Sequence, residues 1–169
     1  IRERLSLAAE AGAQKGIMFL VKLEPKGYLA LKDLSGAHEI AGSGQDPFVK
    51  YELMDEERKI NINLADPGVL KRLLQVTAQM SEMEAQDLAG CIVDWRDSDG
   101  ALASAAAGAE SPYYRNLPYP YEAKDADFQI LEELLLVKGM SQEIFEKIQS
   151  FVTIYGNGKI NINTVSLPV

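Results

Sequence analysis

Cysteine, histidine and tryptophan each occur only once in this sequence of 169 residues, as Cys91, His38 and Trp95. A single cysteine excludes an internal disulfide and a cysteine-rich zinc site. A single histidine likewise excludes a histidine-based catalytic or zinc site within one chain. We expect Cys91 to be a buried small residue and His38 to lie in a surface loop.

Long apolar runs and an excess of positive charge are also missing. No run approaches the ~20 apolar residues of a membrane span, so we expect the chain to be soluble as it stands. The formal net charge of −8 repels phosphate backbones, because lysine and arginine supply most nucleic-acid affinity. Acidic residues gathered at one place would instead attract a hard cation such as calcium.

Recognisable catalytic motifs are absent from the sequence. It contains no nucleophile elbow, phosphate loop, zinc motif or catalytic triad, so we do not expect an enzyme. A carboxylate dyad of the glycosidase or aspartic-protease kind is the remaining enzyme alternative, and nothing else in the chain supports it.

Residues 1–21 predict an amphipathic helix, because apolar and small residues recur there at i, i+3 and i+4. The chain starts without an initiator methionine or a signal-peptide pattern, so we expect a fragment whose helix continues before Ile1. Small residues on one side would let another backbone approach closely, and burial against the chain's own sheet is the alternative. The candidate partner-contact residues are Leu5, Ala8, Ala9, Gly12, Ala13 and Gly16.

Short strands are predicted next, over residues 28–36 and over FVKYELMDEE at 48–57, with a Gly- and Ser-rich loop over 38–47 between them. The pentapeptide KININ occurs at 59–63 and again at 159–163, and each copy predicts a strand with one asparagine face. The asparagines either bond neighbouring backbone or face solvent, and the pattern leaves both interpretations open. A Gly-Asn-Gly turn at 156–158 favours a hairpin before the second copy.

Helices are predicted between the two KININ copies, because the apolar period changes from two to about 3.6 after Asn63. Asp66 before Pro67 and the pair Ser81 and Glu84 mark two helix starts. Two further helices are expected at 127–137 and 141–152, with a left-handed cap at Gly139. The simplest architecture is an α+β protein in which two strands of one sheet flank a helical insertion.

A long structured loop is expected at 97–123, and acidic residues stand at its start. Asp94, Asp97 and Asp99 fall where a helix ends, Gly100 permits a sharp turn, and Glu110 follows. Several oxygens on one loop suit a calcium ion, although the spacing is not that of an EF-hand. The alternative is that these carboxylates cap helices and face solvent. The loop's tyrosines are expected to pack it onto the helices: Tyr113, Tyr114, Tyr119 and Tyr121.

The order of several motifs resembles one known family. An A-x-x-A-G helix, KININ-A, CIVDWRDSDG, GAESPYY, YPYEAKDADF, LEELLLVKGM and a closing KININT together resemble the K-type minor pseudopilin of the type II secretion system. The resemblance implies a pilin-like fold, a long N-terminal helix on a small antiparallel sheet, with a large inserted helical domain. It places the pilin-like domain at 1–63 and 153–169 and the insert at 64–152.

The resemblance also implies function. It implies a non-enzymatic subunit at the pseudopilus tip that contacts other minor pseudopilins through its N-terminal helix. The family's precursor carries a membrane-spanning segment on that helix, so we expect an inner-membrane anchor outside this chain and a periplasmic location for this part. In the family this acidic region binds calcium, which implies a calcium role for Asp97, Asp99 and Glu110, and also for Asp94 unless it faces a helix. Asp125 and Asp127 are further candidates through the later loop.

A second resemblance covers the helices alone. I-N-I-N-x-A followed by two capped helices is similar to helix-hairpin-helix modules, which implies a DNA-binding protein of DNA-uptake type as the alternative function. Those modules bind phosphate through a Gly-x-Gly type turn, whereas the corresponding turns here are Thr77-Ala78-Gln79-Met80, which lacks glycine, and Lys138-Gly139-Met140. Given the net charge as well, we interpret the helical part as a degenerate, SAM-like version without the phosphate site.

Overall fold

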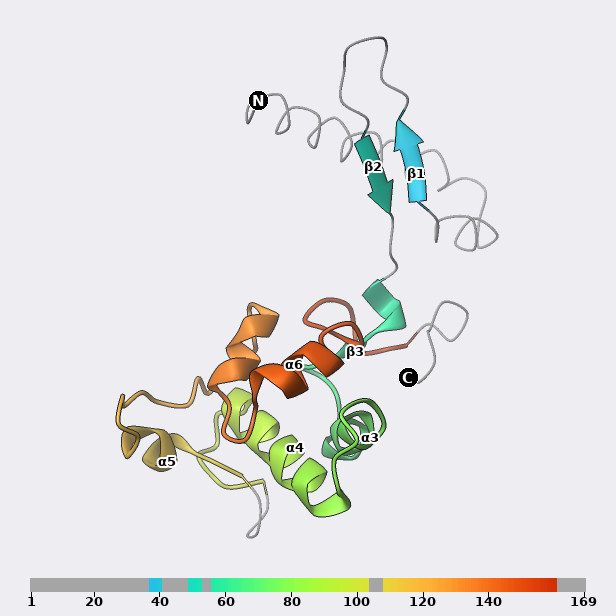
Figure 1. Ribbon diagram of the computed structural model, residues 1–169. Coiled ribbons are helices and arrows are strands. Elements are labelled where there is room, and N and C mark those ends of the chain that lie inside the picture. The colour runs from blue at the N-terminus through green and yellow to red at the C-terminus, as the bar shows by residue number, and fades with distance from the viewer. Residues whose placement is uncertain (1–36, 41–48, 53–55, 104–107, 161–169) are drawn as a thin grey trace, which may run out of the picture. The chain divides into compact units, whose positions relative to one another are not determined.

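The computed structural model describes residues 37–40, 49–52, 56–103 and 108–160 (Figure 1). The chain divides into two compact units, Ile1–Asp55 and Glu56–Val169. The predicted helix at 1–21 and strand at 28–36 lie outside the described residues. No helix in the described part is both long and apolar enough to cross a membrane.

In the first unit the described elements are two strands, β1 (Ala37–Ile40) and β2 (Val49–Glu52). They pair antiparallel, with Ala37 opposite Glu52 and Ile40 opposite Val49. The strand predicted from the alternating FVKYELMDEE pattern is therefore confirmed at its centre. The loop prediction was wrong at its start, because His38 to Ile40 belong to β1 and pair with β2.

The second unit is mainly helical. It contains the 3₁₀ helices η3 (Glu56–Arg58) and η4 (Leu131–Leu136), the α-helices α3 (Pro67–Thr77), α4 (Glu82–Arg96), α5 (Ser111–Arg115) and α6 (Gln142–Ile148), and the strands β3 (Ile60–Asn61) and β4 (Val152–Thr153). Helix α3 packs against α4 and α6, and α6 also contacts η4 (Figure 1).

The helix starts lie where the capping residues predicted them. Helix α3 begins at Pro67 directly after Asp66, although the Asp66 side chain makes no capping hydrogen bond. Before α4 the predicted capping box is present, since Ser81 accepts from the amide of Glu84 and the Glu84 carboxylate accepts from the amide of Ser81. Helix α6 starts after Ser141, whose hydroxyl accepts the amide of Ile144. Gly139 has the expected positive φ, +84°.

Two helices are shorter than predicted, and long-range hydrogen bonds explain why. The predicted helix at 127–137 is reduced to η4, because Phe128 uses its backbone amide and carbonyl to bond the side chain of Asn63. The predicted helix at 141–152 ends at Ile148, because the Phe151 carbonyl accepts the amide of Ile60, 2.9 Å away. The expected loop at 97–123 contains the short helix α5.

The first KININ copy forms β3, but its partner differs from the prediction. Strand β3 pairs in parallel with β4, Ile60 opposite Val152, rather than with the second copy. Residues 159 and 160 are not in a strand, and 161–169 lie outside the described residues. No strand follows the Gly-Asn-Gly turn within the described residues, so the hairpin prediction is not supported there.

The asparagines of the first copy bond neighbouring backbone, which decides between the two interpretations for Asn61 and Asn63. The Asn61 amide group donates to the carbonyls of Tyr155 and Gly156, at 3.0 and 3.1 Å, and its oxygen accepts the amide of Asn63. These bonds fix the chain on both sides of the parallel pair. Asn161 and Asn163 lie outside the described residues.

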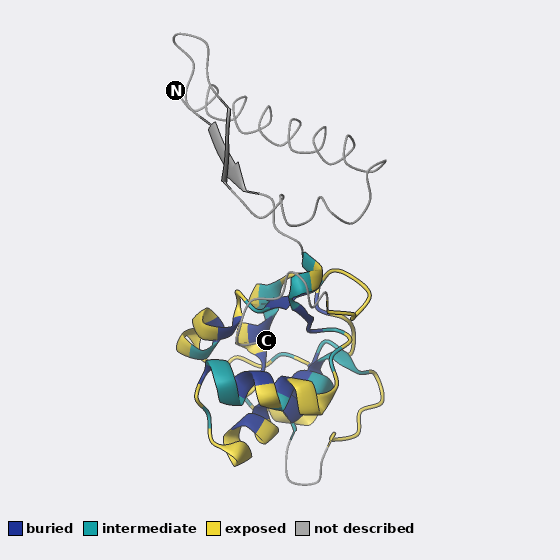
Figure 2. Ribbon diagram, turned by 90° about the vertical axis from the view of Figure 1, so that its right-hand side faces the viewer, coloured by how far each residue is buried: buried dark blue, intermediate teal, exposed yellow. Residues whose placement is uncertain are grey.

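One continuous apolar core holds the second unit together, and its buried residues line the inner faces of the helices (Figure 2). Its fully buried members come from distant parts of the sequence and include Ile62, Leu74, Ile92, Leu134, Ile148 and Val152. Cys91 is 3% exposed, so the expectation of a buried cysteine is confirmed. Tyr114 is completely buried as predicted, whereas Tyr119 is 88% exposed and does not pack the loop.

The compact second unit starts before the predicted insert. It begins at Glu56 rather than at residue 64, because β3 and both asparagines are bonded to residues of the helical part. The predicted pilin-like domain, 1–63 and 153–169, lies largely outside the described residues and stays a prediction.

Candidate metal centre

The acidic cluster begins where α4 ends. Arg96 is the last helical residue, and Asp97 leaves the helix in an extended conformation while its amide still donates to the Val93 carbonyl at 2.9 Å. Two residues later the Asp99 carboxylate accepts the amide of Ala101 at 2.8 Å, which closes a tight turn. Gly100 occupies that turn with a φ of +68°, so its conformational freedom is used there.

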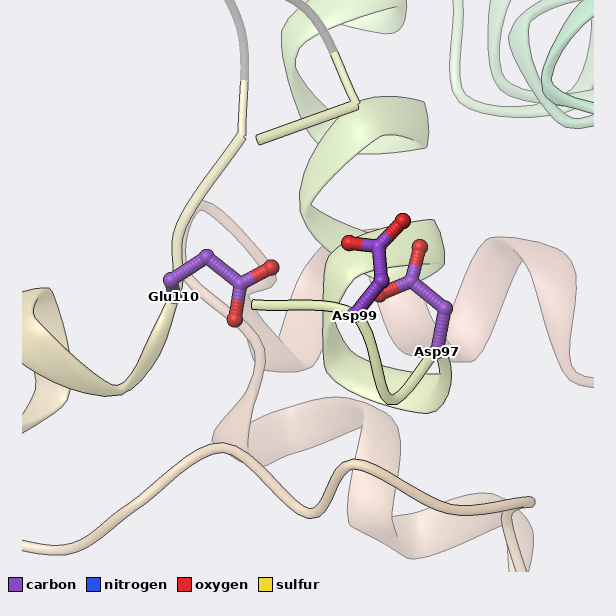
Figure 3. Close-up of side chains that lie close together, drawn as sticks. All are labelled: Asp97, Asp99 and Glu110. Atoms are coloured by element: carbon purple, nitrogen blue, oxygen red, sulfur yellow. The ribbon is translucent and has the colours of Figure 1, made fainter. Parts of the chain in front are cut away.

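Three carboxylates meet beside this turn. One oxygen each of Asp97, Asp99 and Glu110 lies within 4.8 Å of the others. Figure 3 shows Glu110, from the segment before α5, with its carboxylate extending toward Asp99 and Asp97 at the end of α4. A hard cation with oxygen ligands at 2.3–2.6 Å would separate opposite ligands by about 4.6–5.2 Å, so the three oxygens fit around one such ion.

Two oxygens of this cluster are buried and have no hydrogen-bond partner within the described residues, Asp97 Oδ1 and Glu110 Oε1. Glu110 as a whole is only 7% exposed. Leaving a buried carboxylate oxygen unpartnered is costly, and a bound cation would satisfy it. This pair of orphaned oxygens is the strongest structural sign that the residues fit a metal ion.

The electrostatic surroundings agree with that fit. Burial raises the pKa of Glu110, and the neighbouring charges of Asp94 and Asp97 raise it further. Burial also raises the pKa of Asp97, reinforced by Asp99 and Asp94 and opposed by Arg96. Like charges that are gathered and partly desolvated disfavour their own ionised forms, and a divalent cation at their centre would reverse both effects.

Asp94 is not brought into the cluster of three. It is completely buried, and its two carboxylate oxygens accept the backbone amides of Ala103 and Ala109, at 2.6 and 2.8 Å. Burial raises the pKa of Asp94, an effect that these two hydrogen bonds oppose. Each Asp94 oxygen therefore has one hydrogen bond to the loop, and Asp94 is not among the three clustered carboxylates.

The two later aspartates occupy different surroundings. Asp125, at a φ of +51°, donates its amide to the Trp95 carbonyl, and its charge contributes to the raised pKa values of Asp97 and Glu110. Asp127 lies near the Arg96 guanidinium, where its charge opposes the lowering of that group's pKa by burial. Neither belongs to the cluster of three.

Arg96 makes a long-range contact that the sequence interpretation missed. Its guanidinium donates to the carbonyls of Ile62 and Ala65, the latter at 2.6 Å, and so ties the end of α4 to the KININ segment. The available signal was one arginine inside an otherwise acidic motif, and nothing local indicated that its partners would be backbone carbonyls more than thirty residues earlier.

Trp95 lies directly beside the cluster in sequence and is buried, at 3% exposed. Its ring packs edge-on against Tyr114, with ring centres 5.2 Å apart, and against Tyr121, at 6.1 Å. Tyr114 and Tyr121 stack on each other, and the Tyr121 hydroxyl donates to the Leu136 carbonyl. This aromatic group connects the end of α4 to the segments that follow Glu110, which makes Trp95 a reporter of the site.

The predicted partner-contact residues on the N-terminal helix, Leu5, Ala8, Ala9, Gly12, Ala13 and Gly16, lie outside the described residues. Their role stays a prediction.

Comparison with known proteins gives the chain a family. The family model for the type II secretion system (T2SS), protein K, matches residues 45–157. The type II secretion system protein K of Aeromonas hydrophila is 33% identical over 96 residues, which cover 56% of this chain and 29% of that protein. The chain thus spans less than a third of the curated relative's length.

A solved structure shows the same fold. The crystal structure of the GspK-GspI-GspJ complex from the enterotoxigenic Escherichia coli type 2 secretion system contains a chain that matches with a TM-score of 0.64. The match covers 94% of this chain and 64% of that one at 17% sequence identity, so it shows fold similarity alone. The family match over residues 45–157, which include β2, the helices and the acidic cluster, shows that this chain belongs to the type II secretion system protein K family.

Proposed function

We propose that this chain is the periplasmic part of a minor pseudopilin at the tip of the type II secretion pseudopilus, where it has a structural rather than a catalytic role. The observation that carries this proposal is the family match over residues 45–157. The proposal includes a pilin-like fold with an inserted helical domain and an inner-membrane anchor on the N-terminal helix. The antiparallel β1–β2 pair and the separate helical unit support that architecture.

The proposed partners are the I-type and J-type minor pseudopilins, because a chain of similar fold was solved in a complex of GspK with GspI and GspJ. We place the contact on the small-residue side of the N-terminal helix, where a second helix can approach closely. A bulky helical unit would hinder addition of a further subunit above it, which is consistent with a terminal position.

Co-purification with the I-type and J-type pseudopilins of the same organism tests this assignment. The chain should elute with both, and Gly12→Leu should abolish the complex because the leucine side chain holds the helices apart. Gln14→Leu is the matched control, since residue 14 falls on the opposite side of the helix predicted for residues 1–21, and it should leave the complex intact. Absence of any complex with the unmodified chain would contradict the proposed partners.

A second part of the proposal is that Asp97, Asp99 and Glu110 bind calcium. The donor set is made of hard carboxylate oxygens, and two of those oxygens are buried without a partner among the described residues. A bound calcium ion would supply fixed positive charge that draws Glu110 to the end of α4 and holds the loop closed. Backbone carbonyls and water would complete the coordination.

Thermal unfolding followed by Trp95 fluorescence tests the ion site, first in excess EDTA and then in millimolar calcium. A ligand that binds only the folded chain stabilises it by ~2.7 kcal/mol at a hundred times its dissociation constant, so calcium should raise Tm by several degrees. Asp99→Asn should remove most of that shift. An unchanged Tm in metal-free protein at all calcium concentrations would contradict the site.

DNA binding is not expected of the helical unit. The turn between α3 and α4 reverses at Gln79, with a φ of +57°, instead of at the glycine that phosphate-binding hairpins use. A gel-shift assay with duplex DNA at low salt should therefore show no complex at micromolar protein. A tight, salt-sensitive complex would overturn this expectation.

A further inference from the structure

The Asp94 carboxylate accepts hydrogen bonds from two separate points of the loop that leads to Glu110. Its oxygens accept the amide of Ala103 on one side and of Ala109 on the other, and residues 104–107 between them lie outside the described residues. The carboxylate is completely buried on the last turn of α4. A buried carboxylate with two backbone donors is a strong and specific anchor, because each bond is charge-assisted.

Gly108, the residue before Ala109, lies directly against the Asp94 carboxylate. A Cβ atom added to Gly108 would lie 2.1 Å from Asp94 Oδ2, a distance at which something must shift, and Gly108 has a φ of +131°. The loop therefore approaches the carboxylate so closely that only glycine fits. The Lys138 ammonium group donates to the Gly108 carbonyl at 3.2 Å and holds the same flank from the other side.

We propose that Asp94 is a positioning residue for the cation site and not one of its ligands. Glu110 follows Ala109 directly, and Asp97 follows the helical turn that carries Asp94, so the Asp94–Ala109 hydrogen bond sets how far Glu110 lies from Asp97. Both Asp94 oxygens already accept backbone amides, whereas Asp97 and Glu110 each retain a buried oxygen atom without a partner in the described part. This inference rests on the proposed calcium site and assigns the residue that builds it.

The test compares variants of the full chain with two readouts. The first is calcium affinity, by titration calorimetry. The second is amide hydrogen exchange of Ala103 and Ala109 in metal-free protein, which does not depend on the ion. Asp94→Asn and Gly108→Ala both disturb the anchor, and Asp99→Asn removes a ligand. Asp87→Asn is the charge-matched control, because Asp87 is an exposed acidic residue of the same helix.

Asp94→Asn and Gly108→Ala should each speed exchange at Ala109 in metal-free protein and weaken calcium binding about 10–100-fold, the usual effect of losing a residue that orients metal ligands. Their effects on affinity should not add in the double variant, because both act through one contact. Asp94→Asn should still reach the full calorimetric signal at high calcium. Asp99→Asn should lower affinity without changing metal-free exchange, and Asp87→Asn should change neither.

Other outcomes would overturn the inference. If Asp94→Asn abolished calcium binding and left metal-free exchange at Ala109 unchanged, Asp94 would be a ligand. If the anchor variants sped exchange but left affinity within twofold of the unmodified chain, the anchor would not serve the site. If the unmodified chain bound no calcium, the proposed ion site itself would fall, and the exchange rates would still decide whether Asp94 holds the loop.

Discussion

Asn63 shows how a single side chain can define a segment's conformation. Its amide group donates to the Phe128 carbonyl at 3.0 Å, and its oxygen accepts the Phe128 amide at 2.8 Å, as a neighbouring strand would do. Phe128 is itself buried, so a residue between two helical elements is held in the core by one asparagine.

Replacing Asn63 by aspartate should therefore destabilise the unit. The carboxylate keeps the acceptor for the Phe128 amide but removes the donor to the Phe128 carbonyl, and a lost partner of this kind costs about 1–3 kcal/mol. Urea unfolding monitored by circular dichroism measures the difference. Asn157→Asp, at an exposed position, should change stability by less than about 0.5 kcal/mol, and equal effects of the two variants would contradict the explanation.

The lowered pKa of Glu133 should make the stability of the folded chain depend on pH. Burial acts to raise its pKa, but hydrogen bonds from Lys124 and from the amides of Gln129 and Ile130 outweigh burial, and the pKa lies below its usual value. A carboxyl group whose pKa is lowered on folding stabilises the protein above its unfolded value of about 4.3, and that contribution is lost as the pH falls through the folded value.

We therefore expect Glu133→Gln to be less stable than the unmodified chain at pH 7, with a difference that shrinks as the pH falls below about 4.3. Urea midpoints collected between pH 7 and pH 3 measure this trend. Glu132→Gln is the adjacent exposed control and should follow the unmodified chain. A difference for Glu133→Gln that stayed constant with pH would rule out the carboxylate as its source.

At the scale of secondary-structure elements, the capping residues set where helices begin. Ser81→Ala should destabilise α4 by about 1 kcal/mol, because the Glu84 amide loses its acceptor and the capping box is broken. Thermal unfolding measures the loss. Ser150→Ala, at an exposed position after α6, should remain within about 0.5 kcal/mol of the unmodified chain. A neutral Ser81→Ala would show that packing alone holds the start of α4.

Helix starts marked by a capping residue could be predicted from the sequence, whereas helix boundaries set by long-range hydrogen bonds could not. Ser81 and Ser141 act on amides three residues away, so their effect is visible locally. The start of η4 and the end of α6 depend instead on Phe128 and Phe151, whose backbone groups bond residues more than sixty positions away, and no local period reveals such partners. For the same reason Val152 was included in the predicted helix, although its pairing with Ile60 makes it part of strand β4.

The candidate site was predicted in part. Oxygen-rich residues and the family resemblance together selected Asp97, Asp99 and Glu110, which the structure brings together. The anchoring role of Asp94 was hidden, because it depends on amides nine and fifteen residues further along a loop without a repeating pattern. Residue type thus indicates candidate ligands, whereas the path of the backbone decides which carboxylates come together and which one bonds the loop.

At the scale of the whole molecule, the second unit should fold without the first. Its apolar core is continuous and is drawn from described residues between Ile60 and Val152. We expect a chain of residues 56–169 to unfold cooperatively in urea and to keep the calcium response of the longer chain. Circular dichroism and Trp95 fluorescence should give coincident transitions. A broad, non-cooperative transition would show that the unit needs residues 1–55.

The parallel pairing of β3 with β4 also has a consequence for biosynthesis. Ile60 and Ile62 leave the ribosome well before Phe151 and Thr153, which accept their amides, and at 5–20 residues per second the delay is on the order of ten seconds. During that interval β3 has no strand partner, and Ile60 and Ile62, which are buried in the folded chain, lack the residues that cover them. Truncated or stalled chains that end before Val152 would keep this edge exposed, which would make them targets for chaperones and proteases while completed chains escape.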